Sequence, residues 1–314
     1  MSVLARRRLL SWTSLALFAA SWLWGGCGPR GAPSVPTPAV RAGAASATRF
    51  ETSRLIPQLE AARGPGRGPY RIMGRREEQA SVKVLKAWLM GTRAAPPQAF
   101  VRFPWGERGA QLWSAVEGGG AYVFRRRALS PVVVEVPHSF SDLKTFAIGL
   151  ELYLRLSAKA LLVSGTQRRT GCAEEAQFCL SDVAHARTSA FHAVHRALIE
   201  GHPDRLVVAV HGFAERKGDP LVVLSASKSR LALSGLAARL AQVLSAYSLR
   251  PVATFPDEID RLGGTTGTQA KHTASASARF MHLELSRDLR EALVKSPALM
   301  SAFANAVAPE ARPP

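Results

Sequence analysis

The sequence contains few cysteines, few acidic residues and no long apolar run beyond its N-terminus. Only 3 of its 314 residues are cysteine, which excludes a structural zinc site built from two cysteine pairs. The 23 acidic residues stand against 41 Lys and Arg, so the formal net charge is +18. A charge of this sign favours anionic lipid surfaces, acidic polymers or substrates that carry a carboxylate. Beyond residue 24 no apolar segment is long enough to cross a bilayer.

The basic residues are not accompanied by the features of a nucleic-acid-binding protein. Aromatic side chains are not interleaved with them, and no recognised nucleic-acid module is present. The basic runs lie at Arg75–Arg76, Arg125–Arg127 and Arg168–Arg169. We therefore expect no nucleic-acid partner, and we assign most of these charges to a solvated surface.

The first residues have the pattern of an export signal. Arg6–Arg8 precede an apolar stretch, Leu9–Trp24, which is followed by two glycines and Cys27. This order predicts a lipoprotein-type signal peptide over residues 1–27, with Cys27 lipidated as the mature N-terminus. A plain signal peptide or an uncleaved anchor is the alternative, because Trp24 stands where an aliphatic residue is usual. We expect an exported protein of the bacterial cell envelope, anchored to a membrane by its N-terminal lipid.

Composition divides the rest of the chain. Residues 28–48 are rich in Gly, Ala, Pro and Ser and contain few large apolar side chains, which is typical of a flexible linker. Residues 49–314 are enough for one full hydrophobic core, so we expect a single α/β domain. Within it, we expect residues 49–130 to form an N-terminal helix and hairpin portion and residues 131–300 to form the catalytic core.

With Cys27 assigned to lipid, two cysteines remain, Cys172 and Cys179. In an oxidising compartment a close pair of this kind forms a local disulfide. The ring that it closes is short, so we expect the disulfide to staple one polar loop rather than to hold the fold together.

Apolar runs rich in β-branched residues alternate with segments of helical periodicity. A helix is predicted over Ser81–Met90 and a hairpin with a glycine turn over Gln111–Arg126. The later alternation predicts an α/β fold, a mostly parallel mixed sheet with helices on both faces, whose site lies at the carboxyl ends of the strands. The predicted strands are Val132–Val136, Ala160–Ser164, Leu206–Val210, Leu221–Ser225, Val252–Phe255 and Arg279–Leu285, and the predicted helices are Leu143–Leu156, Thr188–Ile199, Ser234–Ala246 and Arg287–Val294.

Two histidines stand where apolar strands end. His138 follows Val-Val-Val-Glu-Val-Pro, and His211 follows Leu-Val-Val-Ala-Val. A catalytic zinc takes about three protein ligands and keeps one position open, and both histidines can reach it if their strands are near neighbours. Asp142 is the preferred third ligand and Glu135 is the alternative; capping of the helix that begins near Leu143 is a second explanation for Asp142. We therefore predict one zinc ion.

A carboxylate stands at the end of a later strand, in the sequence Phe-Met-His282-Leu-Glu284-Leu-Ser. Alternation along a strand places His282 and Glu284 on one face. Near zinc, Glu284 can take a proton from water and pass it to a leaving amine, so we predict that it is the catalytic acid and base. The alternative is an ion pair between Glu284 and Arg287 or Arg290.

Two further segments bear on the site. His192 and His195 lie three residues apart on a predicted helix, and we expect them on a partly exposed surface because no acidic partner is evident. Residues 263–269, Gly-Gly-Thr-Thr-Gly-Thr-Gln, are expected to form a mobile loop able to cover the substrate, with no helix beginning in it.

The order of these motifs resembles that of the N-formylglutamate amidohydrolase family. The motifs are Val-Pro-His138-Ser, Ser181-Asp182-Val-Ala-His185, Val-His211-Gly-Phe and Leu-Glu284-Leu-Ser-Arg. More distantly, the chain is similar to the zinc carboxypeptidases, which share a phosphorylase/hydrolase-like α/β fold. The resemblance covers residues 131 to 290.

The resemblance implies roles for individual residues. His138 and His211 match zinc histidines, Asp142 matches an acidic ligand, and Glu284 matches the catalytic glutamate of the carboxypeptidases. Two departures stand beside these matches. Phe140 replaces the glycine usual after Pro-His-Ser in the amidohydrolases, and three residues rather than two separate His138 from Asp142.

Four more residues are expected to bind substrate. By resemblance, Arg168 or Arg169 stands where amidohydrolases have an arginine-rich substrate segment, and a guanidinium there can hold a carboxylate through two hydrogen bonds. Asp182 and His185 are expected to contact substrate, or in the case of Asp182 to orient a histidine ligand.

Together these patterns predict a zinc-dependent hydrolase of an amide bond adjacent to a carboxylate, tethered in the cell envelope. Its expected partner is a small molecule or peptide that carries a carboxylate. Export does not suit histidine catabolism, so N-acyl amino acids or cell-wall peptides are expected in place of formylglutamate. The alternative, suggested by the charge imbalance and the imperfect motifs, is a non-catalytic envelope protein on the same fold that binds an anionic cell-wall or lipid ligand.

Overall fold

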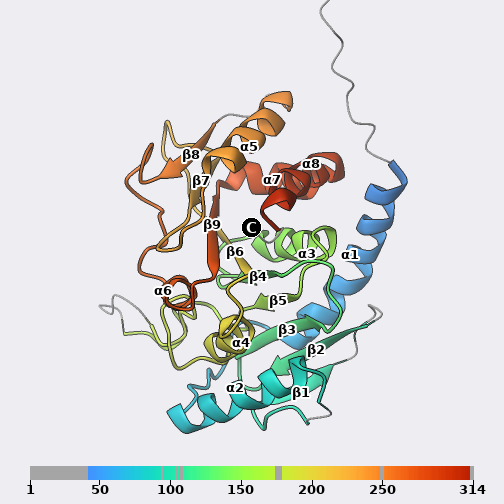
Figure 1. Cartoon of the computed structure of the whole chain (residues 1–314), viewed down its shortest axis with the longest axis vertical. Coiled ribbons are helices and arrows are strands. Elements are labelled where there is room, and N and C mark those ends of the chain that lie inside the picture. The colour runs from blue at the N-terminus through green and yellow to red at the C-terminus, as the bar shows by residue number, and fades with distance from the viewer. Residues whose placement is uncertain are drawn as a thin grey trace, which may run out of the picture. The chain divides into compact units, whose positions relative to one another are not determined.

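One mixed β-sheet forms the centre of this computed structural model (Figure 1). The structure describes residues 42–92, 95–103, 105, 109–173, 179–247 and 251–311, with side chains from Ser53 onward. Its strands lie in the order β1-β2-β3-β5-β4-β6-β9-β7-β8. They are β1 (Phe100–Phe103), β2 (Ala110–Ala115), β3 (Gly120–Arg125), β4 (Val132–Val136), β5 (Ala160–Val163), β6 (Leu206–Gly212), β7 (Val222–Ser225), β8 (Val252–Phe255) and β9 (Arg279–Leu285). The expected α/β class is confirmed.

The centre of the sheet is parallel and its flanks are largely antiparallel. β5, β4, β6 and β9 run in one direction. β1, β2 and β3 form an antiparallel meander beside β5, which includes the predicted hairpin. On the other side β7 is antiparallel to β9 and parallel to β8. The parallel arrangement expected for most of the sheet is therefore found mainly in its four central strands.

The chain reverses its course across the sheet between β4 and β6. From β4 it passes through α3 (Thr145–Arg155) to β5, and it then returns over the other face through α4 (Ala190–Ile199) to β6. Because the two connections diverge, a crevice opens outside the carboxyl ends of β4 and β6. This is the part of an open α/β sheet at which ligands bind.

Helices cover both faces of the sheet, as expected, and each face has its own hydrophobic core. α1, α3, α5, α7 and α8 pack on the face to which Val132, Val134 and Val136 point. α2, α4 and α6 pack on the face to which Val133 points. The remaining helices are α1 (Ala42–Arg63), α2 (Arg75–Leu89), α5 (Ser234–Ala246), α6 (Thr268–Ser275), α7 (Arg287–Lys295) and α8 (Pro297–Val307), followed by a 3-10 turn over Ala308–Ala311.

The periodicity of the sequence does not predict α1, α6, α8 or β1. α1 begins at Ala42, so residues 42–48 are helical although their composition is typical of a linker. Alanine is the strongest helix former, and Leu55 and Leu59 of the same helix are fully buried in the core. α6 begins at Thr268, so a helix does begin within the expected loop.

The predicted signal peptide and its lipidated Cys27 lie outside the described residues, and the limits of the predicted domains stay predictions. In the part of the chain that the structure describes, no helix combines the length and the apolarity needed to span a membrane. The predicted disulfide between Cys172 and Cys179 is present, with a Cα–Cα distance of 5.3 Å that is ordinary for such a bond.

Candidate metal and catalytic site

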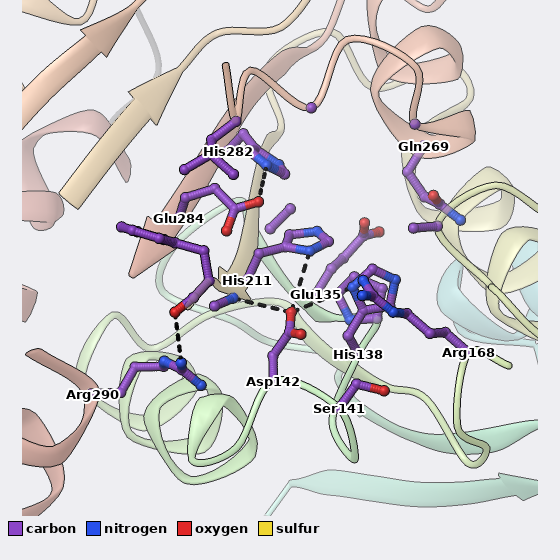
Figure 2. A pocket seen from close by; sticks show the side chains of 18 of the residues that line it. Glu135, His138, Ser141, Asp142, Arg168, His211, Gln269, His282, Glu284 and Arg290 are labelled. Atoms are coloured by element: carbon purple, nitrogen blue, oxygen red, sulfur yellow. Dashed lines mark hydrogen bonds and ion pairs between the residues drawn. The ribbon is translucent and has the colours of Figure 1, made fainter. Parts of the chain in front are cut away.

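The ends of three central strands carry the candidate site residues. His138 follows β4 by two residues, and the backbone N–H of Asp142 donates to the His138 carbonyl at 2.8 Å, which turns the chain so that both side chains face the crevice. His211 lies within β6, and the register of β6 with β9 pairs it with Glu284. The sequence therefore places four polar side chains at neighbouring strand ends (Figure 2).

His138, Asp142 and His211 form a group that can hold a metal ion. One ligand atom from each lies within 4.8 Å of the other two, and all three residues are buried. Nδ1 of His138 is 3.4 Å, and Nδ1 of His211 is 3.7 Å, from Oδ2 of Asp142. Among the described residues no other set of three His, Cys, Asp or Glu side chains converges in this way. Two nitrogens and one carboxylate oxygen are a ligand set that suits catalytic zinc.

The carboxylate of Asp142 does not cap the following helix. Its Oδ2 accepts a hydrogen bond at 3.0 Å from the backbone N–H of Gly212, at the end of the neighbouring strand β6. α3 begins after Lys144, and no side chain caps it. The capping explanation for Asp142 is therefore wrong, because the acid is directed across the crevice rather than along its own helix.

Charges around His138 favour its protonated form when no metal is bound. Burial lowers the pKa of His138, but hydrogen bonds and charges from Asp142 and Asp182 outweigh it and raise the pKa to about 9. Burial raises the pKa of Asp142, and the contacts with His138 and His211 outweigh this and lower it. Burial first, and then the neighbouring His282, lowers the pKa of His211 to about 4.

Asp182 lies behind His138 rather than in the cavity. Its Oδ1 is 2.9 Å from Nε2 of His138. A carboxylate at this position fixes the tautomer and the orientation of a histidine and leaves its other ring nitrogen free for a metal. This is the orienting role expected for Asp182, and it directs Nδ1 of His138 toward Asp142.

Glu135 is not part of the ligand group. Its Oε1 lies 2.7 Å from Nδ1 of His195, and both residues are fully buried. Burial raises the pKa of Glu135 and lowers that of His195. The alternative ligand is thus occupied by a partner from α4, the helix that covers its face of the sheet.

The expectation that His192 and His195 lie on a partly exposed surface is wrong. They are 5% and 0% exposed, and their rings pack with that of His272 from α6, with centroids 5.1 to 5.7 Å apart. Burial lowers the pKa of His192 to about 2 and that of His272 to about 4. The acidic partner is Glu135 of a distant strand, which the sequence of α4 does not reveal.

Glu284 presents a free carboxylate oxygen beside the metal group. Its Oε1 lies 3.0 Å from Nε2 of His282, two residues earlier on the same face of β9. Its Oε2 is buried and has no hydrogen-bond partner among the described residues. The expected alternative is wrong, because Arg287 pairs with Glu291 and Arg290 donates to backbone carbonyls.

His282 is a site residue whose role the sequence does not show. Its ring centroid lies 4.5 Å from that of His211, so it packs against one of the three residues of the metal group and also contacts Glu284. The backbone of Gly264 lies against the other side of the ring, and a Cβ there would approach His282 to 2.7 Å. Only glycine at position 264 leaves room for the His282 ring, so the loop can pack directly against this histidine.

A cavity of about 800 Å³ opens over these groups, and the segment expected to cover the substrate contributes to its wall. Gly264, Thr266, Gly267 and Gln269 of that segment all line the cavity. Its helical end is held in place, because the Gln269 amide donates to the Val183 carbonyl at 2.8 Å and the Thr268 backbone N–H to Ala184 at 2.7 Å.

The four predicted substrate-binding residues have different positions. Arg168 and His185 line the cavity, and Asp182 lies behind His138. Arg169 is not among the residues that line it. Of the two arginines, Arg168 is the one that lines the cavity.

Phe140, the departure from the amidohydrolase pattern, has a structural explanation. The Arg63 guanidinium lies over its ring at 4.0 Å. Gly66, with φ of +74°, approaches the same ring so closely that a Cβ would lie 2.5 Å from it. The aromatic side chain thus anchors the segment after α1 beside the turn that carries His138.

No protein-family model matches the sequence, and no curated protein matches it. Among solved structures, the chain is similar to N-formylglutamate amidohydrolase from Ralstonia eutropha JMP134, with 10% identity, a TM-score of 0.37 and coverage of 60% of this chain and 96% of that chain. It is similar to a metallo-carboxypeptidase from Burkholderia cenocepacia, with 12% identity, a TM-score of 0.37 and coverage of 64% of each chain. A bacteriophage poly-gamma-glutamate hydrolase has 12% identity, a TM-score of 0.37 and coverage of 58% of this chain and 84% of that chain. The structures to which the chain is similar thus include both groups that its sequence motifs resemble.

Proposed function

We propose that this protein is a zinc-dependent hydrolase that cleaves an amide bond adjacent to a carboxylate in an N-acyl amino acid or a cell-wall peptide. The observation that carries the proposal is the convergence of His138, Asp142 and His211 beside Glu284, whose Oε2 has no partner among the described residues. A buried, unpartnered carboxylate oxygen is costly to maintain unless it has a ligand or a reaction to serve.

The ligand group suits zinc. Nε2 of His138 is occupied by Asp182, so Nδ1 is the atom that would bind the ion, together with a ring nitrogen of His211 and a carboxylate oxygen of Asp142. A bound zinc ion would polarise the scissile carbonyl and lower the pKa of water. Three protein ligands leave a coordination position for the reactants.

Glu284 moves the proton in the proposed reaction. Its Oε2 accepts a proton from the attacking water while the water oxygen bonds to the carbonyl carbon. The same proton then passes to the amide nitrogen as the carbon–nitrogen bond breaks, so that the products are a carboxylic acid and an amine. His282 holds Oε1 of Glu284, which keeps Oε2 directed to the reactants.

The proposed substrate carboxylate is recognised by Arg168. This side chain lines the cavity, and guanidinium groups bind carboxylates through two parallel hydrogen bonds. His185 and Gln269 line the same cavity and offer further polar contacts. A carboxylate held by Arg168 would distinguish this substrate class from neutral amides.

The cellular setting of the proposal follows from the sequence. The N-terminal pattern predicts export and a lipid on Cys27, so the protein would act in the bacterial envelope while anchored to a membrane. The Cys172–Cys179 disulfide is consistent with an oxidising compartment. N-acyl amino acids and cell-wall peptides are carboxylate-bearing amides available there, and no nucleic-acid partner is proposed.

Metal content tests the proposal. Elemental analysis of the purified protein should find about one zinc per chain, and His211→Ala should lose the zinc while keeping its circular dichroism spectrum. His202→Ala is the matched control, because His202 lies in the loop before β6, at the opposite end of that strand from His211, and should keep the zinc.

Activity is then measured on N-acyl amino acids and cell-wall peptides, with the corresponding carboxamide-terminated compounds as controls. Release of amine from the carboxylates alone would support the proposed reaction. A protein that takes up no zinc after reconstitution, yet retains acidic cell-wall fragments, would instead be the non-catalytic anionic-ligand binder.

A further inference from the structure

Arg290 of α7 is a buried cation that the proposed reaction does not use. It is 6% exposed, and its guanidinium donates three hydrogen bonds to backbone carbonyls in three different segments. Nη1 donates to Leu143 at 2.5 Å, Nη2 to Phe213 at 3.1 Å and Nε to Ser286 at 3.2 Å. Figure 2 shows this side chain on the Asp142 side of the site.

Each of the three carbonyls belongs to a segment that carries a site residue. Leu143 directly follows Asp142. Phe213 lies two residues after His211, and Ser286 lies two residues after Glu284. One side chain therefore links the ends of β6 and β9 with the turn after β4, although these segments are far apart in the sequence.

The residue beside His211 is adapted to this arginine. A Cβ at Gly212 would lie 2.5 Å from Cζ of Arg290, so the guanidinium is packed directly on the Gly212 backbone. The N–H of the same glycine donates to Oδ2 of Asp142 at 3.0 Å. Gly212 thus connects the arginine to a proposed metal ligand through one peptide unit, and any larger residue there would displace one of them.

We propose that Arg290 is a positioning residue that holds the segments bearing Asp142, His211 and Glu284 at the spacing needed for zinc binding. This inference rests on the proposed zinc site. A planar guanidinium has five N–H donors in a fixed arrangement and can meet three carbonyls at once, whereas a lysine ammonium is a compact charge on a flexible stem. Burial lowers the pKa of Arg290, and the charges of Asp142, Glu215 and Glu284 counter part of this effect.

Arg279 provides a matched control. It also donates from its guanidinium to backbone carbonyls, those of Glu310 at 2.9 Å and Asp204 at 3.2 Å. It stands at the first residue of β9, at the opposite end of the strand from Glu284. Loss of the Arg279 hydrogen bonds therefore removes comparable contacts to the backbone but leaves the metal and catalytic site unchanged.

The test is the zinc dissociation constant, measured by competition with a chromophoric chelator for wild type, Arg290→Met, Arg290→Lys and Arg279→Met. We expect Arg290→Met to bind zinc about 10- to 100-fold more weakly, as is usual when a partner of the metal ligands is lost. Arg290→Lys should fall between Arg290→Met and wild type, and Arg279→Met should bind as wild type does. Thermal unfolding and circular dichroism identify variants that do not fold.

Chemical rescue separates positioning from general stability. Added methylguanidinium should restore zinc affinity to Arg290→Ala, because the ion can occupy the vacated space and bond the same carbonyls, and it should leave Arg279→Ala unchanged. If Arg290→Met does not fold, Arg290→Lys and the rescue carry the test.

Three outcomes would overturn the inference. The first is a folded Arg290→Met that binds zinc as wild type does. The second is an equal loss of affinity in Arg279→Met, which would point to stability alone. The third is a wild type that binds no zinc, which would refute the proposed function as well; in the first two cases the proposed function stands.

Discussion

At the scale of single residues, two oxygen atoms of one carboxylate have different environments. Oε1 of Glu284 is held by His282, whereas Oε2 is buried without a partner among the described residues. The first contact fixes the side chain, and the second atom is available for proton transfer. A group with this division of contacts is suited to act as a base because it needs no reorganisation before it reacts.

Glu284→Gln tests this assignment, because the amide has the same shape but cannot take a proton. We expect hydrolysis to fall by about 10²- to 10⁴-fold, while the zinc content and the melting temperature stay near those of wild type. Steady-state kinetics, elemental analysis and thermal unfolding are measured on the same preparations. Glu258→Gln, at an exposed carboxylate beside β8, is the control, and retention of full activity by Glu284→Gln would remove the residue from the reaction.

Site residues that stand at the end of an apolar strand are predicted from the sequence. His138, His211 and Glu284 each follow or end an apolar run, and the structure brings all three to one crevice. His282 was placed on the correct face by alternation, but its contact with Glu284 depends on side-chain orientation within a packed strand. Arg290 could not be assigned, since its partners are backbone carbonyls of segments up to 147 residues away.

At the scale of elements, the packing of α4 against α6 brings together three imidazoles, those of the buried His192 and His195 and of the partly exposed His272. His192, His195 and His272 lie with ring centroids 5.1 to 5.7 Å apart. Burial lowers their pKa values to about 2, 3 and 4, respectively, well below the ordinary histidine value of 6.5. The contact between these helices therefore depends on the histidines remaining neutral.

Because these pKa values are lower in the folded protein than in the unfolded chain, acid destabilises the fold. Below pH 6.5 the unfolded chain binds protons at these histidines and the folded chain does not, so the free energy of unfolding decreases as the pH falls from 6.5 toward 4. Each histidine contributes at most about 1.4 kcal/mol per pH unit in this window. Urea unfolding at pH 7.0, 6.0 and 5.0 measures the slope.

His192→Phe should reduce the pH slope and should not lower stability at pH 7, because Nδ1 of His192 is buried without a partner among the described residues. Tyr247→Phe, an aromatic change on the surface, serves as the control. If the free energy of unfolding of His192→Phe changes with pH as steeply as that of wild type, protonation of His192 does not contribute to the pH dependence.

Helices and strands are predicted from the sequence where periodicity alone indicates them, and they are missed where they depend on tertiary contacts. Strands β4, β6 and β9 were predicted because their apolar runs are continuous or strictly alternating. The start of α1 falls within the predicted linker, residues 28–48, because a composition rich in Gly, Ala, Pro and Ser does not by itself indicate a helix. The partly exposed surface expected for His192 and His195 of α4 is not found, because α6 packs against these histidines and the sequence pattern does not predict α6.

At the scale of the whole molecule, two cores on opposite faces stabilise the sheet that carries the site. α8, which the sequence pattern did not predict, contributes the fully buried Phe303 to the first of them. The ring packs in the same core as the residues of β4 and β6 that point away from the site. The C-terminal helix is thus part of the structure that supports the strand ends.

Phe303→Ala should lower the free energy of unfolding by about 3–5 kcal/mol, because it leaves a cavity in a closely packed core. Met90→Ala, at a side chain that is 84% exposed, should change it by less than about 0.5 kcal/mol. Urea unfolding at pH 7 measures both. Equal small effects would show that α8 is not integrated into the core.

The sequence by itself determined the fold class, the strand ends that carry His138, His211 and Glu284, and the local disulfide between Cys172 and Cys179. These depend on hydrophobic periodicity and on residues close together along the chain. Only the tertiary structure decided that Asp142 rather than Glu135 lies beside His138 and His211. The physical reason is that each buried polar group must find a partner, and the partner of Glu135 is supplied by a helix 60 residues further along the chain.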